Sequence, residues 1–248
     1  MTTRRRAAHR AALDDATLAL PFSLPGTKAV SSEGLDLDLG IDEAGRGPIL
    51  GPMVLACVVL RPHDATALRD EGVCDSKRFG AGPAAHQARL QLAEHIRRRA
   101  VHVGVAIVAP HEIDARVGQL NHLEREHATR LIDAAPPCAR MFADGVRLFS
   151  PLVARYPQLV AQDRAESAFV CVAAASIVAK ATRDSLWLAI CERYQAEFAP
   201  LLSGHAGGGY PNEATRRFLR AYYGRYRCLP PEARKSWPSD FLAEPTSP

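Results

Sequence analysis

The sequence has no apolar run long enough to cross a membrane. A membrane-spanning helix needs roughly 18 uninterrupted apolar residues. The best run in this chain of 248 residues, GPMVLACVVL at positions 51–60, is short and rich in β-branched side chains. Such a run is typical of a buried strand, so we expect no partner within a membrane.

Paired cysteines are also missing. The chain has six cysteines but no CxxC pair, the spacing typical of zinc sites and redox motifs. Cys57, Cys171 and Cys191 lie within apolar or helical patterns. We interpret the cysteines as reduced core residues and expect a cytoplasmic protein.

Lysine is scarce, since only four of the 31 basic residues are lysines and the other 27 are arginines. The planar fork of arginine suits phosphate recognition. A GC-rich genome would produce the same bias, so both explanations stay open.

The opening of the sequence resembles the basic start of a signal or transit peptide only in part. The basic opening MTTRRRAAHRAALDDATLAL is interrupted by Asp14 and Asp15, and no long apolar stretch or small-residue cleavage site follows. We predict that residues 1–35 form a disordered basic tail and linker, which can add nonspecific affinity for nucleic acid.

Strand and helix patterns alternate through the rest of the chain. Strands are predicted at 37–45, 52–60, 101–109 and 139–146, and helices at 83–99, 111–118, 120–135, 170–198 and 212–224. The segment 170–198 is expected to begin as a strand end, and the last helix to end at Gly224 before a Pro-rich tail. This alternation predicts one α/β layered domain, residues 36–240, with 241–248 as a tail.

Acidic residues mark the predicted strand ends. Asp42, Glu43 and Asp144 are each followed within two residues by glycine, and a fourth candidate is Asp163 or Glu166. Mg²⁺ prefers oxygen ligands, and three or four carboxylates can hold two metal ions for phosphoryl displacement. Acid–glycine pairs are also ordinary turns, so spacing leaves both interpretations open.

A polar stripe marks the long helix. Ser176, Lys180 and Asp184 are spaced by four and share one helix face. Such a stripe must meet something polar, and the candidates are phosphate or an internal ion pair between Lys180 and Asp184.

Five motifs together carry a family resemblance. GIDEAGRGPILGP, DSKR, ADG, AAASIVAKATRD and GGGY follow one another in the order and approximate spacing seen in type 2 ribonucleases H. The chain resembles a bacterial ribonuclease HII from about residue 37 to 237. The resemblance implies a ribonuclease H-like fold, with a mixed central sheet flanked by helices and a helical C-terminal extension, and a monomer.

The resemblance also implies a metal site. By similarity, Asp42, Glu43 and Asp144 supply three of four metal-binding carboxylates. The family places the fourth ten residues before the serine of the AASI motif, which favours Glu166 over Asp163. A glutamate there resembles the ribonuclease HIII group, although we expect the segment before the first motif to be too short for that group's extra N-terminal domain.

Asp42 and Glu43 are adjacent, and successive side chains on a strand point to opposite faces. Both can reach one metal site only if the strand ends there. The segment Gly45-Arg46-Gly47 is expected to end the strand at once, so that Glu43 turns toward the same metals. Its carboxylate should then lie within metal-sharing reach of those of Asp42 and Asp144.

Substrate contacts follow from the same resemblance. The GRG element contacts the ribonucleotide and its phosphate through backbone amides, and the tyrosine of the GGGY motif stacks on the sugar at the RNA–DNA junction. The expected nucleic-acid-binding residues are Gly45, Arg46, Gly47, Ser76, Lys77, Ser176, Lys180, Arg183 and Tyr210.

The implied activity is endonucleolytic. The enzyme would use two Mg²⁺ or Mn²⁺ ions to hydrolyse the RNA strand of RNA–DNA hybrids and to cleave 5′ to ribonucleotides embedded in duplex DNA. Products would carry 5′-phosphate and 3′-hydroxyl ends, as in primer or ribonucleotide removal during replication and repair. The alternatives are a ribonuclease HIII-like preference for long hybrids, or a noncatalytic hybrid-binding protein. No protein partner is evident, since the C-terminal SDFLAEPTSP contains no clear clamp-binding motif.

Overall fold

The computed structural model describes residues 36–73, 80, 82–199, 201–202 and 208–237. The predicted terminal tails, 1–35 and 241–248, lie outside these residues. So do two of the predicted phosphate-binding residues, Ser76 and Lys77, and part of the loop that precedes Tyr210.

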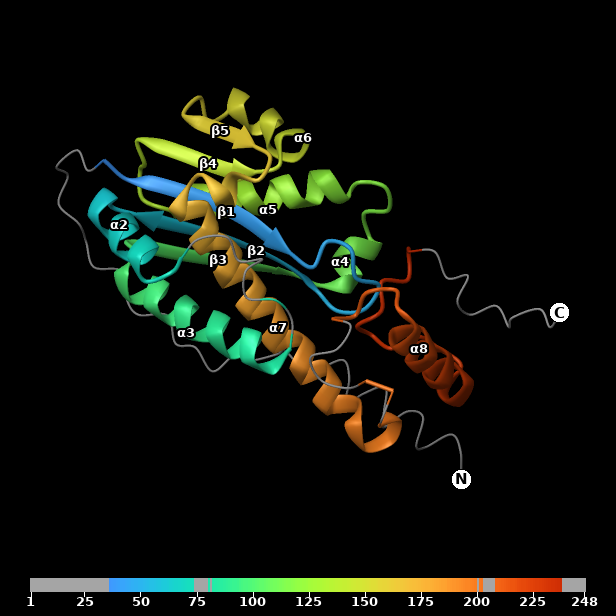
Figure 1. Ribbon diagram of the computed structural model, residues 1–248. Helices are drawn as coiled ribbons and strands as arrows, with labels where there is room; N and C mark the ends of the chain where they lie inside the picture. Colours follow the sequence, from blue (N-terminus) through green and yellow to red (C-terminus); the bar gives the residue numbers. More distant parts are fainter. Residues whose placement is uncertain (1–35, 74–79, 81, 200, 203–207, 238–248) are drawn as a thin grey trace.

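Five strands of the described chain form one mixed sheet in the order β3-β2-β1-β4-β5 (Figure 1). β1 is antiparallel to β2 and parallel to β4, with Ile41 opposite Ala143. Because the two parallel strands end at the same edge, the next residue of each, Asp42 and Asp144, comes to one place. The strands are β1 (Asp38–Ala44), β2 (Met53–Leu60), β3 (His102–Val108), β4 (Arg140–Asp144) and β5 (Leu159–Gln162).

Helices cover both faces of this sheet. The long helix α7 crosses one face beside α3, and α5 packs against the other (Figure 1). The α-helices are α2 (Pro62–Asp70), α3 (Pro83–Arg99), α4 (Pro110–Asp114), α5 (Leu120–Ala134), α6 (Val146–Phe149), α7 (Val170–Phe198) and α8 (Glu213–Tyr226). Two short 3-10 helices are η2 (Ser150–Ala154) and η3 (Ala165–Ser167).

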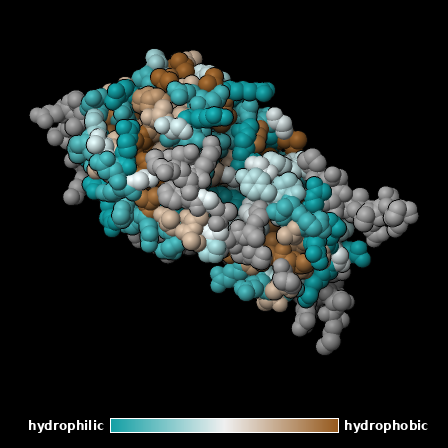
Figure 2. Space-filling view, in the orientation of Figure 1, coloured by the Kyte–Doolittle hydropathy of each residue, from teal (hydrophilic) through white to brown (hydrophobic). Residues whose placement is uncertain are grey.

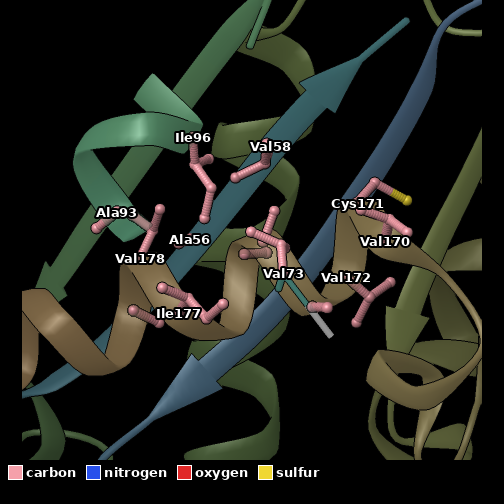
Figure 3. Close-up of a cluster of buried hydrophobic side chains, with 14 of the residues drawn as sticks. Ala56, Val58, Val73, Ala93, Ile96, Val170, Cys171, Val172, Ile177 and Val178 are labelled. Carbon is pink, nitrogen blue, oxygen red and sulfur yellow. The ribbon is translucent and has the colours of Figure 1, made fainter. Parts of the chain in front are cut away.

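One buried core joins α7 and α3 to the sheet. Figure 3 shows side chains of this core, among them Val58 of β2, Ile96 of α3 and Ile177 of α7. The contact is closest at Gly40 of β1, where an added Cβ would lie 2.1 Å from the carbonyl carbon of Cys171. α7 therefore packs on β1 at backbone distance, and this fixes its polar face relative to the strand end.

A separate aromatic core attaches α8 to the second half of α7. Tyr194 and Phe198 of α7 pack against Phe218 and Tyr222 of α8. The side chain of Asn212 caps α8 by accepting a hydrogen bond from the Thr215 N–H, at 2.9 Å. The outer surface is mostly hydrophilic on the face shown in Figure 2, where apolar areas are small and scattered.

Most predicted elements are present, with corrections at element ends. The segment 170–198 is helical from Val170 onward, because its apolar residues pack on the sheet as one side of a helix. Gly224 does not end the last helix, which continues to Tyr226 and stops where Arg227 turns left-handed at φ 57°. α2, the four-residue helix α6 and the four-residue strand β5 were not predicted.

Within the described part of the chain, no helix combines the length and the apolar character needed to cross a membrane. The longest, α7, carries charged side chains along its middle turns.

Candidate nuclease site

Asp42 lies at the end of β1 on the face covered by α7. Its side chain is 6% exposed, and it accepts hydrogen bonds from the Ser176 hydroxyl and from the Glu43 N–H, the latter at 2.8 Å. Burial raises the pKa of the Asp42 carboxyl to about 6, although Ser176 and the nearby Lys180 oppose the shift. The polar stripe of α7 therefore meets the carboxylate of β1.

The stripe is a hydrogen-bonded chain. The Lys180 ammonium donates to the Ser176 hydroxyl at 2.9 Å, and Ser176 in turn donates to Asp42. Asp184 takes a different partner from the one considered in the sequence, since it accepts from Nε and Nη2 of Arg89 at 3.0 and 2.7 Å.

Asp144 and Glu166 form the second acidic pair. Asp144 accepts a hydrogen bond from the Ala165 N–H at 3.0 Å, which draws η3 against the end of β4. Burial, followed by the charge of Glu166, raises the pKa of Asp144. Glu166 is itself only 5% exposed.

Asp163, the other candidate for the fourth acid, occupies a different environment. It is exposed, and its carboxylate accepts a hydrogen bond from the Val146 N–H at 2.9 Å, at the start of α6. The structure thus places Glu166, and not Asp163, in the buried environment of Asp144.

Glu43 leaves β1 on the sheet face opposite to that of Asp42, as expected for successive residues of a regular strand. β1 stays regular through Ala44, so Glu43 lies on the side of α5, near Glu124 and Arg46. Burial and the neighbouring Asp42 raise the pKa of Glu43 to about 8, and its Oε2 atom is buried without a hydrogen-bond partner.

The predicted approach of the Glu43 carboxylate to those of Asp42 and Asp144, within metal-sharing reach, stays a prediction. Within the ranges that the structure describes, no three His, Cys, Asp or Glu side chains are arranged to hold a metal ion. The two β1 acids nevertheless interact electrostatically with each other and with Asp144.

The loop after β1 is held by residues that sequence reasoning missed. Gly45 has φ +83°, a conformation that favours glycine. The Arg46 guanidinium donates to Glu124 and Asn121 of α5. Glu124 is fully buried, and its burial raises its pKa despite the arginine. The available signal was a charged residue, Glu124, on the mostly apolar buried face of α5, beside Leu131 and Ala128.

Beside the acids lies an open cleft of about 280 Å³. Tyr210 forms part of its wall, half exposed, with its ring against Gly47: a Cβ on this glycine would lie 3.1 Å from the ring. The cleft is lined by Glu43, Ala44, Gly45, Arg46, Gly47, Lys180, Arg183, Asp184, Gly208 and Tyr210.

Two residues expected to bind nucleic acid are buried. Ser176 is fully buried beneath Asp42, so a direct phosphate contact is not compatible with its position. Arg183 is 5% exposed, donates from Nη2 to the Leu50 carbonyl at 3.2 Å and lies over the Trp187 ring. Ser176 therefore supports Asp42 from beneath, whereas Arg183 lines the cleft, and its contact with nucleic acid stays a prediction.

The acids fit a divalent cation in chemistry and in charge. Burial raises the pKa of Asp42, Glu43 and Asp144, and repulsion between neighbouring carboxylates adds to it. Hard oxygen donors of this kind are what Mg²⁺ and Mn²⁺ prefer. Buried acids at the ends of adjacent parallel strands, beside a cleft with basic walls, define a nuclease of the ribonuclease H-like class.

Comparisons with known proteins agree with this class. The family model described as Ribonuclease HII matches residues 39–239. Ribonuclease HII of Thermofilum pendens is 36% identical over 218 residues, which is 80% of this chain and 94% of the relative. Ribonuclease HII of Thermococcus sibiricus is 35% identical over 211 residues, 80% of this chain and 87% of the relative.

Solved structures show the same fold. The ribonuclease H2 from Pyrococcus horikoshii superposes with a TM-score of 0.68 at 28% identity, over 83% of this chain and 95% of that chain. The chain belongs to the ribonuclease HII family and is an endoribonuclease, a hydrolase of phosphodiester bonds. The predicted ribonuclease H-like fold with its helical C-terminal extension is confirmed. The narrower resemblance to bacterial members stays a prediction.

Proposed function

We propose that this enzyme cleaves duplexes on the 5′ side of a ribonucleotide, both in RNA–DNA hybrids and where a ribonucleotide is embedded in DNA, and leaves 5′-phosphate and 3′-hydroxyl ends. The observation that supports this most strongly is the position of Asp42 and Asp144. They lie at adjacent strand ends beside a cleft that carries the Gly45-Arg46-Gly47 loop and Tyr210.

Four carboxylates are the proposed metal ligands: Asp42, Glu43, Asp144 and Glu166. When bound, two Mg²⁺ or Mn²⁺ ions would activate a water for in-line attack and stabilise the leaving 3′-oxygen. The buried Oε2 of Glu43, which has no hydrogen-bond partner, supports a role as a ligand.

Lys180 and Ser176 favour the ionised form of Asp42, which is the form that binds a metal ion. The hydroxyl of Ser176 and the charge of Lys180 both favour the ionised carboxylate against the effect of burial. The same hydrogen bonds fix its orientation toward the strand end. Lys180 also lines the cleft, where its charge favours a phosphate.

The cleft supplies recognition of the ribose. The 2′-hydroxyl distinguishes RNA from DNA, and the backbone amides of the GRG loop are proposed to bind it together with the flanking phosphate. Tyr210 is proposed to stack on the sugar at the junction, and the exposure of its ring beside Gly47 supports this role. Ser76 and Lys77, outside the described residues, stay proposed phosphate contacts.

A ribonuclease HIII-like preference for long hybrids is the second candidate. The buried acid beside Asp144 is a glutamate, Glu166, and by resemblance this residue type is typical of that group.

One assay tests both candidates. Cleavage is compared between a DNA duplex with one embedded ribonucleotide and a hybrid with a long RNA strand, each with Mg²⁺, with Mn²⁺ and with chelator. We expect cleavage 5′ to the single ribonucleotide, lost on chelation. Cleavage of the long hybrid alone would favour the second candidate, and binding without any cleavage would favour a noncatalytic protein.

A further inference from the structure

The segment after α8, expected as a Pro-rich tail, is packed against the loop that follows β1. The Gly51 N–H donates to the Glu232 carbonyl at 2.8 Å, and the Arg234 N–H donates to the Ile49 carbonyl at 2.9 Å. Leu50 and Ala233 form a β-bridge between the two segments. The end of the described chain is therefore part of the wall of the site.

Within this segment, the Arg234 side chain reaches three carbonyls of the loop. Its Nη1 donates to the Arg46 carbonyl at 2.8 Å, its Nη2 to the Gly45 carbonyl at 2.5 Å, and its Nε to the Gly51 carbonyl at 3.1 Å. The side chain is 3% exposed, and its guanidinium lies over the Trp237 ring. It is thus fully engaged beneath the loop and is not available as a surface contact.

The geometry of the peptide unit gives these contacts a consequence for the cleft. In a planar trans peptide the carbonyl and the following N–H point in opposite directions. Because Arg234 holds the carbonyls of Gly45 and Arg46, the N–H groups of Arg46 and Gly47 point away from it. These are the amides of the loop that lines the cleft.

We propose that Arg234 is a positioning residue, which holds the GRG loop so that the N–H groups of Arg46 and Gly47 face the ribonucleotide. This inference rests on the proposed function of the loop. Lysine is no substitute, because its ammonium is a point charge, whereas the guanidinium presents its donors in a fixed planar fork. Arg234 holds backbone carbonyls of the loop, whereas Glu124 accepts a hydrogen bond from the Arg46 side chain.

The same segment offers a matched control at a distance from the loop. Asp114 accepts hydrogen bonds from the Lys235 and Ser236 N–H groups, at 3.0 and 2.8 Å. Asp114→Asn weakens the attachment of the segment without removing a contact to the GRG loop. A merely structural role for Arg234 predicts that both variants behave alike.

The test is a ratio of affinities. Binding of the full chain is measured in chelator, without cleavage, to a DNA duplex with one ribonucleotide and to the same duplex in DNA only. We expect wild type to bind the ribonucleotide duplex more tightly than the DNA-only duplex. Arg234→Gln should lower this preference about tenfold, which is the scale of one charge-assisted hydrogen bond. Asp114→Asn should keep the wild-type preference. Arg234→Lys should also lose most of the preference, and it serves if the glutamine variant does not fold.

The outcomes separate the positioning role of Arg234 from the proposed function of the enzyme. A folded Arg234→Lys or Arg234→Gln protein with the wild-type ratio overturns the positioning role, while the proposed function stands if wild type still prefers and cleaves the ribonucleotide duplex. If wild type shows neither preference nor cleavage with Mg²⁺ or Mn²⁺, the proposed function fails and the inference fails with it.

Discussion

At the scale of single residues, the site concentrates negative charge in a buried place. Asp42 and Glu43 leave β1 on opposite faces, and each carboxyl has a raised pKa because water is excluded around it and other acids are near. Such an arrangement lowers the stability of the metal-free protein, as is common at functional sites.

Glu43→Gln should stabilise the metal-free protein, and increasingly so at higher pH. The pKa of Glu43 is raised from 4.5 to about 8 in the folded state, so the unfolded chain loses this proton at lower pH. Wild type is therefore expected to lose stability as pH rises from about 4.5 to 8, whereas glutamine cannot ionise. We expect a gain on the order of 1 kcal/mol or more at pH 8, measured by urea unfolding with chelator. Parallel curves for the two proteins across this range would contradict the account.

Metal affinity should rise with pH in the range from 6 to 8. A cation binds ionised carboxylates, so protons must leave Asp42, with its pKa of about 6, and Glu43, with its pKa of about 8. Calorimetric titration with Mn²⁺ in two buffers of different ionisation enthalpy should show proton release at pH 6.5 and less at pH 8.5. Glu43→Gln should release fewer protons, and a pH-independent affinity would refute this linkage.

Sequence reasoning proposed the acids but missed the residues that hold the loop after β1. Asp42 and Asp144 are recognisable because each ends an apolar strand pattern, and the ten-residue spacing to Ser176 selected Glu166, which the structure buries. Glu124 and Arg234 lie 78 and 188 positions from Arg46, so no local pattern connects them to the loop. The side of the strand on which Glu43 lies depends on whether β1 stays regular, and this required coordinates.

At the scale of elements, the contact between β1 and α7 positions the site. Gly40 lets the helix backbone lie directly on the strand. Two residues further along β1, Asp42 then meets the Ser176 and Lys180 side of α7. The register of this one contact brings the carboxylate and its hydrogen-bond chain together.

Gly40→Ala should therefore be strongly destabilising. The added Cβ would lie 2.1 Å from the carbonyl carbon of Cys171 and 2.3 Å from the Val172 nitrogen, and backbone atoms cannot move aside singly. We expect a loss of at least about 2 kcal/mol in the free energy of unfolding.

Gly224→Ala is the matched control within α8. No heavy atom lies within 4 Å of its added Cβ, so alanine should stabilise by about 0.5–1 kcal/mol. Both variants are compared by denaturant unfolding. Equal effects of the two substitutions would show that packing at Gly40 is not as close as described.

Elements with strong periodicity were predictable and short ones were not. The helix α3 matches its prediction at both ends, because proline begins it and its apolar stripe is regular. β5 has only four residues, too few for a strand pattern, and Gly224 was read as a stop although the helix tolerates it. The start of α7 was ambiguous because a short apolar run fits a strand and a buried helix equally.

At the scale of the whole molecule, the cleft joins two packed regions. The acids belong to the sheet, whereas Trp187 and Leu50 belong to the aromatic core around α8. Arg183 of α7 connects them, because it reaches Leu50 and lies over Trp187 while lining the cleft. The proposed recognition by the loop and the proposed hydrolysis by the acids thus depend on a common framework.

The acids at the ends of β1 and β4 are proposed to carry out metal-dependent hydrolysis beside a ribonucleotide. Single-turnover cleavage of a duplex with one ribonucleotide, in Mg²⁺, tests this proposal with three variants. The comparison requires that each variant is at least as stable as wild type. Asp42→Asn and Glu166→Gln should each slow cleavage at least about a hundredfold, while the exposed Asp163→Asn should cleave as wild type does. Wild-type rates for Asp42→Asn, or a loss confined to Asp163→Asn, would contradict the account.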